Sequence, residues 1–413
     1  MHDLQDLLFN ASRLGHAPQL IEGVGASAAL TKIIGRSPRR VMVVASRRTA
    51  EAVPAVASLI RHGAHHYGNT RPNPSLKDAL DLSRAIEQAR PGYIVAVGGG
   101  SAIDQAKAGR LLLPDPSLAD AGLGGSPSAL RPAPPLLVAV PTTAGTGAEM
   151  TPFATLYRGS TKVSLDTERC RPDLAVLDGL LTATCPDRHS LGAALDAMCH
   201  SIESGWSLAS TPASRVYADA ARDHLLAYLA HSDPPSPGIP RWAAPDAAAA
   251  APWRHMLLLA AAVAGVAISQ TRTTGAHAFA YHLTTRYGVP HGFACAASMS
   301  WIESQIAAHQ PSALEDATRA AVETLRGQLD GARLAGLVTL PSMSESALEE
   351  YVDAGLDVRS RMATHPVPLP RTQALRHIGL DGRLTATPGN APYSAYQMPE
   401  TLDRQKRAGI GYI

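Results

Sequence analysis

Three histidines lie in the short stretch from Gly275 to Gly292, namely His277, His282 and His291. Neutral imidazole is the commonest protein ligand of a catalytic metal. His277 belongs to an apolar run that predicts a helix, whereas His291 follows a proline, where that helix must already have ended. We therefore expect one metal ligand to project from a helix and another from a turn beyond it.

The other ligands of this predicted metal site are expected upstream, in the segment ALDAMCHSIES. Asp196 and His200 are four residues apart there, so they share one face of a predicted helix. The predicted ligand set is Asp196, His200, His277 and His291. One carboxylate and three imidazoles suit Fe²⁺ or Zn²⁺, and these ligand types do not separate the two ions.

The first half of the chain alternates short apolar runs with helical periodicity, a pattern typical of a parallel sheet. Strands are expected within 40–47, at 93–98 and at 136–141, and the alternation continues to about Asp178. A second histidine cluster, His62, His65 and His66, falls in this half. Its members are expected to lie in a surface loop rather than to bind another metal.

Two of these strands run into loops that are rich in small or hydroxyl side chains. The first loop carries Gly99, Gly100 and Ser101, with Ser101 expected to cap the next helix, and the second spans 142–151. A glycine loop between a strand and a helix can bind a phosphate, but this one is neither GxGxxG nor GxxxxGK[ST], so a plain tight turn remains an equal alternative. Two such loops at the carboxyl edge of a sheet predict a ligand crevice.

After about residue 186 the pattern becomes helical, with helices expected at 189–207, 212–230, 253–271 and 276–284. We expect an α/β domain over residues 1–186 and an all-helical domain over residues 187–413. The predicted metal ligands lie in the second domain and the two loops in the first. The active site should therefore be the cleft between the domains.

Composition excludes several classes of protein. The net charge of +2, without a basic block, argues against a nucleic-acid partner. Four scattered cysteines without a CxxC pair suggest neither a disulfide framework nor a thiolate zinc site. The N-terminus has no signal-peptide pattern, and the apolar run at 256–268 is too short to span a bilayer. We expect a cytoplasmic protein with no membrane partner.

Four motifs, in this order, resemble the iron-dependent (group III) alcohol dehydrogenase family: GGGSAIDQAK, PTTAGTGAEMT, LDAMCHSIES and an H-x13-H pair that ends in PHG. The resemblance covers the chain from about Val24 to Gly292, and more loosely the remainder. It implies an N-terminal dinucleotide-binding α/β domain and an all-helical metal domain, the fold shared with the dehydroquinate synthases. It also implies an NAD(P)H-linked oxidoreductase that forms a homodimer.

The resemblance assigns roles to individual residues. It places the metal on the four ligands named above and the cofactor pyrophosphate at Gly99, Gly100 and Ser101. Lys162 would lie near the cofactor ribose. Four further residues would line the cofactor: Asp104, Thr142, Thr143 and Thr146.

The position after the first expected strand departs from NAD-preferring members, which carry an acid where this chain has Ser46, followed by Arg47 and Arg48. An acid would bind the ribose 2′-hydroxyl and repel a 2′-phosphate, whereas a serine beside arginines accepts the phosphate. We therefore expect NADPH, with NADH as the alternative if the arginines are merely solvated.

Tyr281 stands four residues after His277, where many members carry a further histidine, and His282 follows it. Tyr281 shares a helix face with His277, whereas His282 points about 100° away. The proton is expected to come from solvent or through Tyr281 or His282, the candidate donors, although a packed or surface position for His282 is an equal alternative.

The segment before His277 holds three hydrogen-bond donors: Arg272, Thr273 and Thr274. A cationic, hydroxyl-rich segment beside the metal suits an anionic substrate, because such donors bind phosphonate or carboxylate. The run TRTTGAHAFAYHLTTRYGVPHG resembles the phosphonoacetaldehyde reductases of phosphonate natural-product pathways. Arg158 and Arg286 are weaker candidates for the same role. In the alternative interpretation, Arg272 pairs with a neighbouring acid.

The expected activity is the NADPH-linked reduction of a small anionic aldehyde, most specifically phosphonoacetaldehyde, to its alcohol. Three alternatives stay open. One is a reductase or dehydrogenase of another small aldehyde or alcohol, such as a semialdehyde. The second is a lyase-type member like the dehydroquinate synthases, and the third is a nucleotide-binding regulator without turnover.

Overall fold

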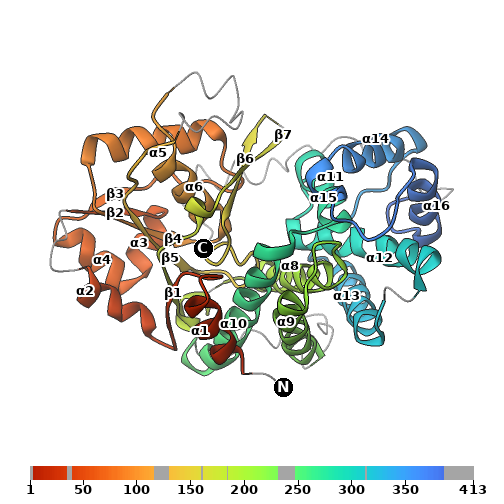
Figure 1. Ribbon diagram of the computed structural model, residues 1–413, viewed down its shortest axis with the longest axis horizontal. Helices are drawn as coiled ribbons and strands as arrows, with labels where there is room; N and C mark the ends of the chain where they lie inside the picture. Colours follow the sequence, from red (N-terminus) through yellow and green to blue (C-terminus); the bar gives the residue numbers. More distant parts are fainter. Residues whose placement is uncertain are drawn as a thin grey trace.

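The computed structural model describes residues 3–34, 40–115, 130–159, 161–183, 185–230, 247–311 and 314–385. A half built on a sheet, red to yellow in Figure 1, lies beside a half built of helices, green to blue. The expected α/β and helical parts are both present.

A six-stranded parallel sheet forms the centre of the first half. In spatial order its strands are β1 (Gln19–Glu22), β8 (Leu174–Leu177), β5 (Leu136–Pro141), β4 (Tyr93–Gly98), β2 (Val41–Val44) and β3 (His65–Tyr67). Without β1 this is the 2-1-3-4-5 order of a doubly wound fold, in which ligands bind beyond the carboxyl ends of the strands. Strands β2, β4 and β5 confirm the three predicted strands, and β8 agrees with the predicted alternation up to about Asp178.

Helices cover both faces of this sheet, which explains why its central strands are continuous apolar runs. Alternate residues of β2 point to opposite faces, so Val41 and Val43 pack with one group of helices and Met42 and Val44 with the other. The first group is α2 (Leu30–Ile33), α3 (Arg47–Ala52) and α4 (Pro54–Arg61), and the second is α5 (Leu76–Ala89) and α6 (Gly100–Leu111). Short 3₁₀ helices lie at Ala26–Ala29, Glu168–Cys170 and Gly179–Thr182.

Some strands of this half escaped prediction. His65 and His66 were expected in a surface loop, but they form the edge strand β3, whose residues pair with β2. Strand β1 is also short, and three or four residues are too few to show a period. An antiparallel hairpin, β6 (Phe153–Arg158) and β7 (Thr161–Asp166), was not predicted either. It borders the cavity that the predicted metal ligands line.

The second half is a set of packed helices: α8 (Asp187–Trp206), α9 (Pro212–Ala230), α10 (Ala247–Thr271), α11 (Gly275–Tyr287), α12 (His291–His309), α13 (Asp316–Leu334), α14 (Glu345–Leu356), α15 (Arg359–Met362) and α16 (Arg371–Asp381). By length and composition Ala251–Thr271 could cross a membrane, but 83% of its most apolar window is buried inside the protein. It is the core of the helical half.

The first helix, α1 (Leu4–Arg13), packs on the helical half. Its buried residues Leu4, Leu8 and Ala11 belong to the same core as α8, α9 and α10. The start of the chain therefore contributes to the helical core, although it lies within the predicted α/β range. The division at residue 186 stays a prediction.

Candidate metal and cofactor site

Three helices bring the four predicted metal ligands together. Asp196 and His200 lie on α8, His277 lies on α11, and His291 is the first residue of α12. The expectation that His291 projects from a turn was wrong. Pro290 is the N-cap residue of α12, and its fixed φ of −58° suits the start of a helix as well as the end of the preceding one.

The ligand atoms have the spacing of groups around one ion. Asp196 Oδ1 lies 3.3 Å from His277 Nε2 and 3.8 Å from both His200 Nε2 and His291 Nε2. Four ligands about 2.1 Å from a tetrahedral metal would be about 3.4 Å apart. Asp196 Oδ1 and His277 Nε2 are buried without a hydrogen-bond partner among the described residues, so these four residues fit a divalent cation.

Three of the four predicted ligands are in the protonation states that metal binding needs. Burial lowers the pKa of His200 and of His291 to about 4, so both imidazoles are neutral near pH 7. Burial alone would raise the pKa of Asp196, but the surrounding imidazoles outweigh it and hold the pKa below its ordinary value. Burial alone would lower the pKa of His277, but Cys295 and Glu203 outweigh it and raise that pKa well above its ordinary value, so metal binding must displace a proton from His277.

Glu203 on α8 orients His277, a role that sequence reasoning missed. Its carboxylate accepts hydrogen bonds from His277 Nδ1 and from Thr274 Oγ1, the latter at 2.7 Å. It also accepts from the backbone N–H groups of Thr274 and Ala276, at the unpaired N-terminus of α11. With its proton held on Nδ1, His277 presents the Nε2 lone pair to the metal. The available signal was the acid three residues after His200 in ALDAMCHSIES.

Glu203→Gln is expected to lower metal affinity about 10- to 100-fold, the usual effect of losing a carboxylate behind a histidine ligand. The measurement is competition with a chelator of known affinity. Glu303→Gln is the control and should bind metal like the wild type, because Glu303 lies twelve residues after His291 on α12 and does not line the cavity. Equal affinity of the Glu203 variant and the wild type would contradict this role.

Cys295 lies beside the predicted ligands, although the sequence suggested no cysteine near the metal. Its Sγ is 3.7 Å from His291 Nε2. One ligand atom each from Asp196, His277, His291 and Cys295 lie within 4.8 Å of one another. Burial raises the pKa of the Cys295 thiol to about 12, which keeps it protonated in this arrangement. The signal was its position four residues after His291, on the same face of one helix.

A cavity of about 210 Å³, which we call the active cavity, joins the metal ligands to the cofactor loops. Its walls include all four ligands and five of the residues predicted to bind cofactor: Gly100, Ser101, Asp104, Thr146 and Lys162. This cavity lies at the carboxyl ends of β4 and β5, where a doubly wound sheet binds its ligand. The metal and cofactor groups therefore face one another, as expected for the cleft.

The two loops pack closely against each other. A Cβ on Gly100 would lie 2.7 Å from Thr146 Oγ1, and one on Gly99 would lie 3.2 Å from Thr143 Oγ1. The cap of α6 is Gly99 rather than the expected Ser101, whose hydroxyl accepts from the N–H of Asn73. Gly99, Thr142 and Thr143 lie outside the cavity wall.

Glu149, in the second loop, makes folding stability depend on pH. Burial raises its pKa from 4.5 to about 7. A raised folded pKa means that stability is fully present below pH 4.5 and is lost as the pH rises through 7. Glu149→Gln is therefore expected to stabilise the protein at pH 8 by up to about 3 kcal/mol more than at pH 4.5. Denaturant unfolding at several pH values measures this, and a difference that does not change with pH would contradict it.

Arg272 and Thr274 were expected to contact the substrate, but their side chains contact other protein groups. Arg272 forms an ion pair with Asp166 of β7 at 2.6 Å and lies over the Phe153 ring. Its guanidinium is thus paired with a neighbouring acid, as the alternative interpretation expected. The Thr274 hydroxyl donates to Glu203 and accepts from Trp206 Nε1. Neither side chain lines the cavity, and neither do Arg158 and Arg286.

Thr273 and Tyr281 do line the cavity, whereas His282 does not. His282 lies between Tyr287 and Tyr351, turned away from the ligands because it is one residue further round α11. The hydroxyl of Thr273 is buried and has no hydrogen-bond partner among the described residues.

Tyr281 is held against the metal site by two contacts. Its ring stacks on His291 with centroids 5.7 Å apart, and its hydroxyl accepts a hydrogen bond from Lys162 Nζ. Burial alone would raise the pKa of Tyr281, but the cations Lys162 and Arg361 outweigh it and bring the pKa to about 8. This phenol is therefore placed to exchange a proton inside the cavity.

Ser46 is the N-cap of α3, where its Oγ accepts from the N–H of Thr49 at 3.1 Å. Arg47 next to it is exposed and pairs with Glu51. The predicted residue thus lies at the carboxyl end of β2, at the edge of the sheet that holds the cavity.

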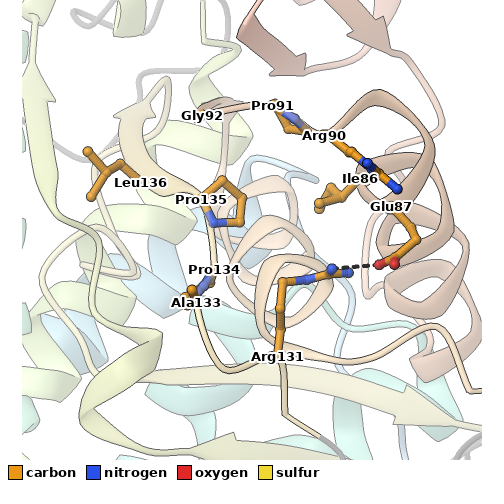
Figure 2. A pocket seen from close by; sticks show the side chains of 10 residues that line it. All are labelled: Ile86, Glu87, Arg90, Pro91, Gly92, Arg131, Ala133, Pro134, Pro135 and Leu136. Atoms are coloured by element: carbon orange, nitrogen blue, oxygen red, sulfur yellow. Dashed lines mark hydrogen bonds and ion pairs between the residues drawn. The ribbon is translucent and has the colours of Figure 1, made fainter.

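A second, larger cavity of about 480 Å³ lies at the opposite edge of the sheet (Figure 2). It is lined by residues at the end of α5 and before β4 and β5, near the amino ends of those strands. The Glu87–Arg131 ion pair across it is 2.6 Å long. Its position away from the carboxyl ends argues against a role in cofactor binding.

Comparisons with known proteins agree with this arrangement. The profile of iron-containing alcohol dehydrogenase matches residues 17–179, and the C-terminal profile of the Fe-containing alcohol dehydrogenase family matches residues 191–331. The chain is 35% identical over 305 residues to phosphonoacetaldehyde reductase of Streptomyces viridochromogenes, covering 68% of this chain and 71% of that protein. It is 34% identical to the probable alcohol dehydrogenase EutG of Escherichia coli, over 52% of each protein.

Solved structures share the fold. Sulfoacetaldehyde reductase of Bifidobacterium kashiwanohense in complex with NAD⁺ has a TM-score of 0.74 at 21% identity, covering 90% of this chain and 98% of that one. An iron-containing alcohol dehydrogenase of Thermotoga maritima has a TM-score of 0.69 at 23% identity, covering 88% and 98%. At these identities the likeness concerns the fold alone.

Proposed function

The chain belongs to the iron-containing alcohol dehydrogenase family, and from this premise we propose that it reduces phosphonoacetaldehyde to 2-hydroxyethylphosphonate with NADPH. As a member of the family it is an NAD(P)-linked oxidoreductase of a small aldehyde or alcohol. The observation that carries the finer proposal is the 35% identity to a phosphonoacetaldehyde reductase across more than two thirds of both chains.

The cavity supplies the parts that such a reduction needs. When bound, the metal supplies a Lewis acid that polarises the aldehyde carbonyl, and the nicotinamide supplies the hydride. Asp196, His200, His277 and His291 would hold the metal, which we propose to be Fe²⁺ rather than Zn²⁺. The Oη of Tyr281 then gives its proton to the oxygen that becomes the product hydroxyl. Lys162 holds that Oη in place.

Kinetics with a panel of aldehydes tests the substrate. The purified enzyme with Fe²⁺ and NADPH should reduce phosphonoacetaldehyde with a higher kcat/KM than acetaldehyde, propanal or succinic semialdehyde. If phosphonoacetaldehyde is no better than the others, the phosphonate proposal fails. Cofactor binding without aldehyde-dependent oxidation of NADPH would instead support the regulator.

Ser46 underlies the proposed preference for NADPH. Ser46→Asp should lower kcat/KM for NADPH and raise the relative use of NADH, because a carboxylate repels the 2′-phosphate and binds the 2′-hydroxyl. We expect the preference ratio to shift about 100-fold, the effect of exchanging a favourable charged contact for a repulsive one. Ser58→Asp, on α4, is the matched control and should leave the ratio unchanged. An unchanged ratio in the Ser46 variant would show that this residue does not face the ribose.

A homodimer and a cytoplasmic location remain predictions. Size-exclusion chromatography with light scattering would measure the mass of the enzyme in solution.

A further inference from the structure

We propose that Arg361, with Lys162 and Thr273, forms the subsite that binds the anionic group of the substrate. The proposal rests on the proposed function for the anionic aldehyde, and it replaces Arg272 as the expected contact. Arg361 lies on the short helix α15, far from the metal motifs in sequence, but its side chain lines the same cavity as the metal ligands.

Arg361 is a buried cation without a protein anion. It is 8% exposed, and in the described part of the chain its side chain has no hydrogen bond and no ion pair. Two other buried arginines have acidic partners: Arg110 pairs with Asp173 at 2.6 Å and Arg222 with Asp219 at 2.7 Å. Burying a charge without a partner costs several kcal/mol, so an anion supplied from outside would satisfy it.

A second cation faces the same space. Lys162 lines the cavity with Arg361, and its described hydrogen bond is to the neutral Tyr281 hydroxyl. Besides the predicted metal ligand Asp196, the cavity wall holds the carboxylate of Asp104, which is engaged elsewhere because it accepts from the N–H of Thr155 and lies 3.6 Å from Lys107. Two converging cations match a phosphonate, which carries up to two negative charges.

Lys162 and Arg361 also line an adjoining cavity of about 570 Å³. Two acids, Glu350 and Asp357, belong to the walls of that cavity. Neither forms an ion pair with Arg361 in the described residues. The guanidinium is thus shared between the two spaces and free to contact a ligand in the active cavity.

Thr273 adds a neutral donor on the side of the metal. Its buried hydroxyl has no partner in the described structure, and its carbonyl accepts from Thr364 Oγ1 at 3.1 Å, which ties it to the segment that carries Arg361. The preceding residue, Arg272, has a φ of 64°, a left-handed conformation that is unfavourable for a non-glycine residue. The Arg272–Asp166 pair therefore fixes a strained turn that directs Thr273 into the cavity.

The position of the subsite explains how a short substrate would be oriented. Metal ligands and Arg361 lie on the wall of one cavity of about 210 Å³. A two-carbon aldehyde with its carbonyl at the ligands would extend its anionic group toward the cations. The pair thus determines both affinity and the direction in which the substrate lies.

The test uses the enzyme loaded with Fe²⁺ and NADP⁺ and compares Arg361→Gln with Arg361→Lys. Arg359→Gln is the control, because Arg359 lies on the same helix but is exposed and does not line the active cavity. Binding of 2-hydroxyethylphosphonate is measured by calorimetry. Arg361→Gln should weaken it about 10- to 100-fold, the range for hydrogen bonds to a charged group, and Arg361→Lys should recover part of the loss. Unfolding temperatures establish that each variant is folded.

Kinetics provide the second measurement. Arg361→Gln should lower kcat/KM for phosphonoacetaldehyde by a much larger factor than kcat/KM for the neutral propanal, for which only the change in the pKa of Tyr281 remains. Unchanged binding, or an equal loss with both aldehydes, overturns the subsite. If the wild type prefers succinic semialdehyde and Arg361→Gln removes that preference, the subsite stands and the phosphonate substrate falls.

Discussion

His277→Ala is expected to release the metal and to lower kcat/KM for aldehyde reduction by at least about 10³-fold, because Lewis-acid stabilisation of the developing charge contributes several kcal/mol. His277 contacts both partners that define the site: its Nε2 is 3.3 Å from Asp196, and its Nδ1 donates to Glu203. Alanine removes a ligand and also leaves the Glu203 carboxylate buried without its strongest partner. Elemental analysis of the purified variant measures the loss of metal, and the rate of NADPH oxidation measures the loss of kcat/KM.

The control for this experiment is His65→Ala. His65 belongs to the other histidine cluster and lies exposed on the edge strand β3, so its loss should leave metal content and activity unchanged. Two outcomes would contradict the assignment: full metal content in the His277 variant, or a loss of metal in the His65 variant. Zinc and iron are measured in the same samples, which determines the metal that the enzyme retains.

That the four proposed ligands lie close together could be predicted because most of this grouping depends on local geometry. Asp196 and His200 share a helix face by spacing alone, and His277 lies in a helix whose apolar pattern is visible in the sequence. Strands β4 and β5 could be predicted for a similar reason, since a parallel strand buried on both faces is a continuous apolar run. His291 was predicted to lie in a turn, but it begins α12. Whether Pro290 only ends one helix or also precedes another depends on the helix after it, which the prediction did not consider.

The contacts that could not be predicted join residues far apart in the chain. Glu203 and His277 are 74 positions apart, and Arg272 and Asp166 are 106 positions apart. Periodicity reports which face a side chain occupies, but it does not report which acid or base faces it from another element. Arg361 belongs to no motif, and only its place in the folded cavity identifies it as a candidate for substrate binding.

Tyr281→Phe is expected to lower kcat/KM for reduction by about 10²- to 10³-fold, within the range for removal of a positioned proton donor. Phenylalanine keeps the ring that stacks on His291 but removes the hydroxyl that contacts Lys162. The metal should therefore stay bound, and the affinity for 2-hydroxyethylphosphonate should stay close to that of the wild type. The loss should appear in kcat rather than in KM, because the missing interaction belongs to the reaction step.

Tyr287→Phe, on the same helix but outside the cavity, is the matched control and should retain wild-type kinetics. Solvent isotope effects on kcat give an independent measure, because proton transfer from Tyr281 Oη should make the wild-type reaction slower in D₂O. Wild-type kcat in the Tyr281 variant would mean that the proton comes from solvent. His282 would not then become the donor by default, since its ring packs beside Tyr287 and Tyr351 and does not reach the cavity wall. The pair of variants thus separates a proton carried by the protein from one delivered by water.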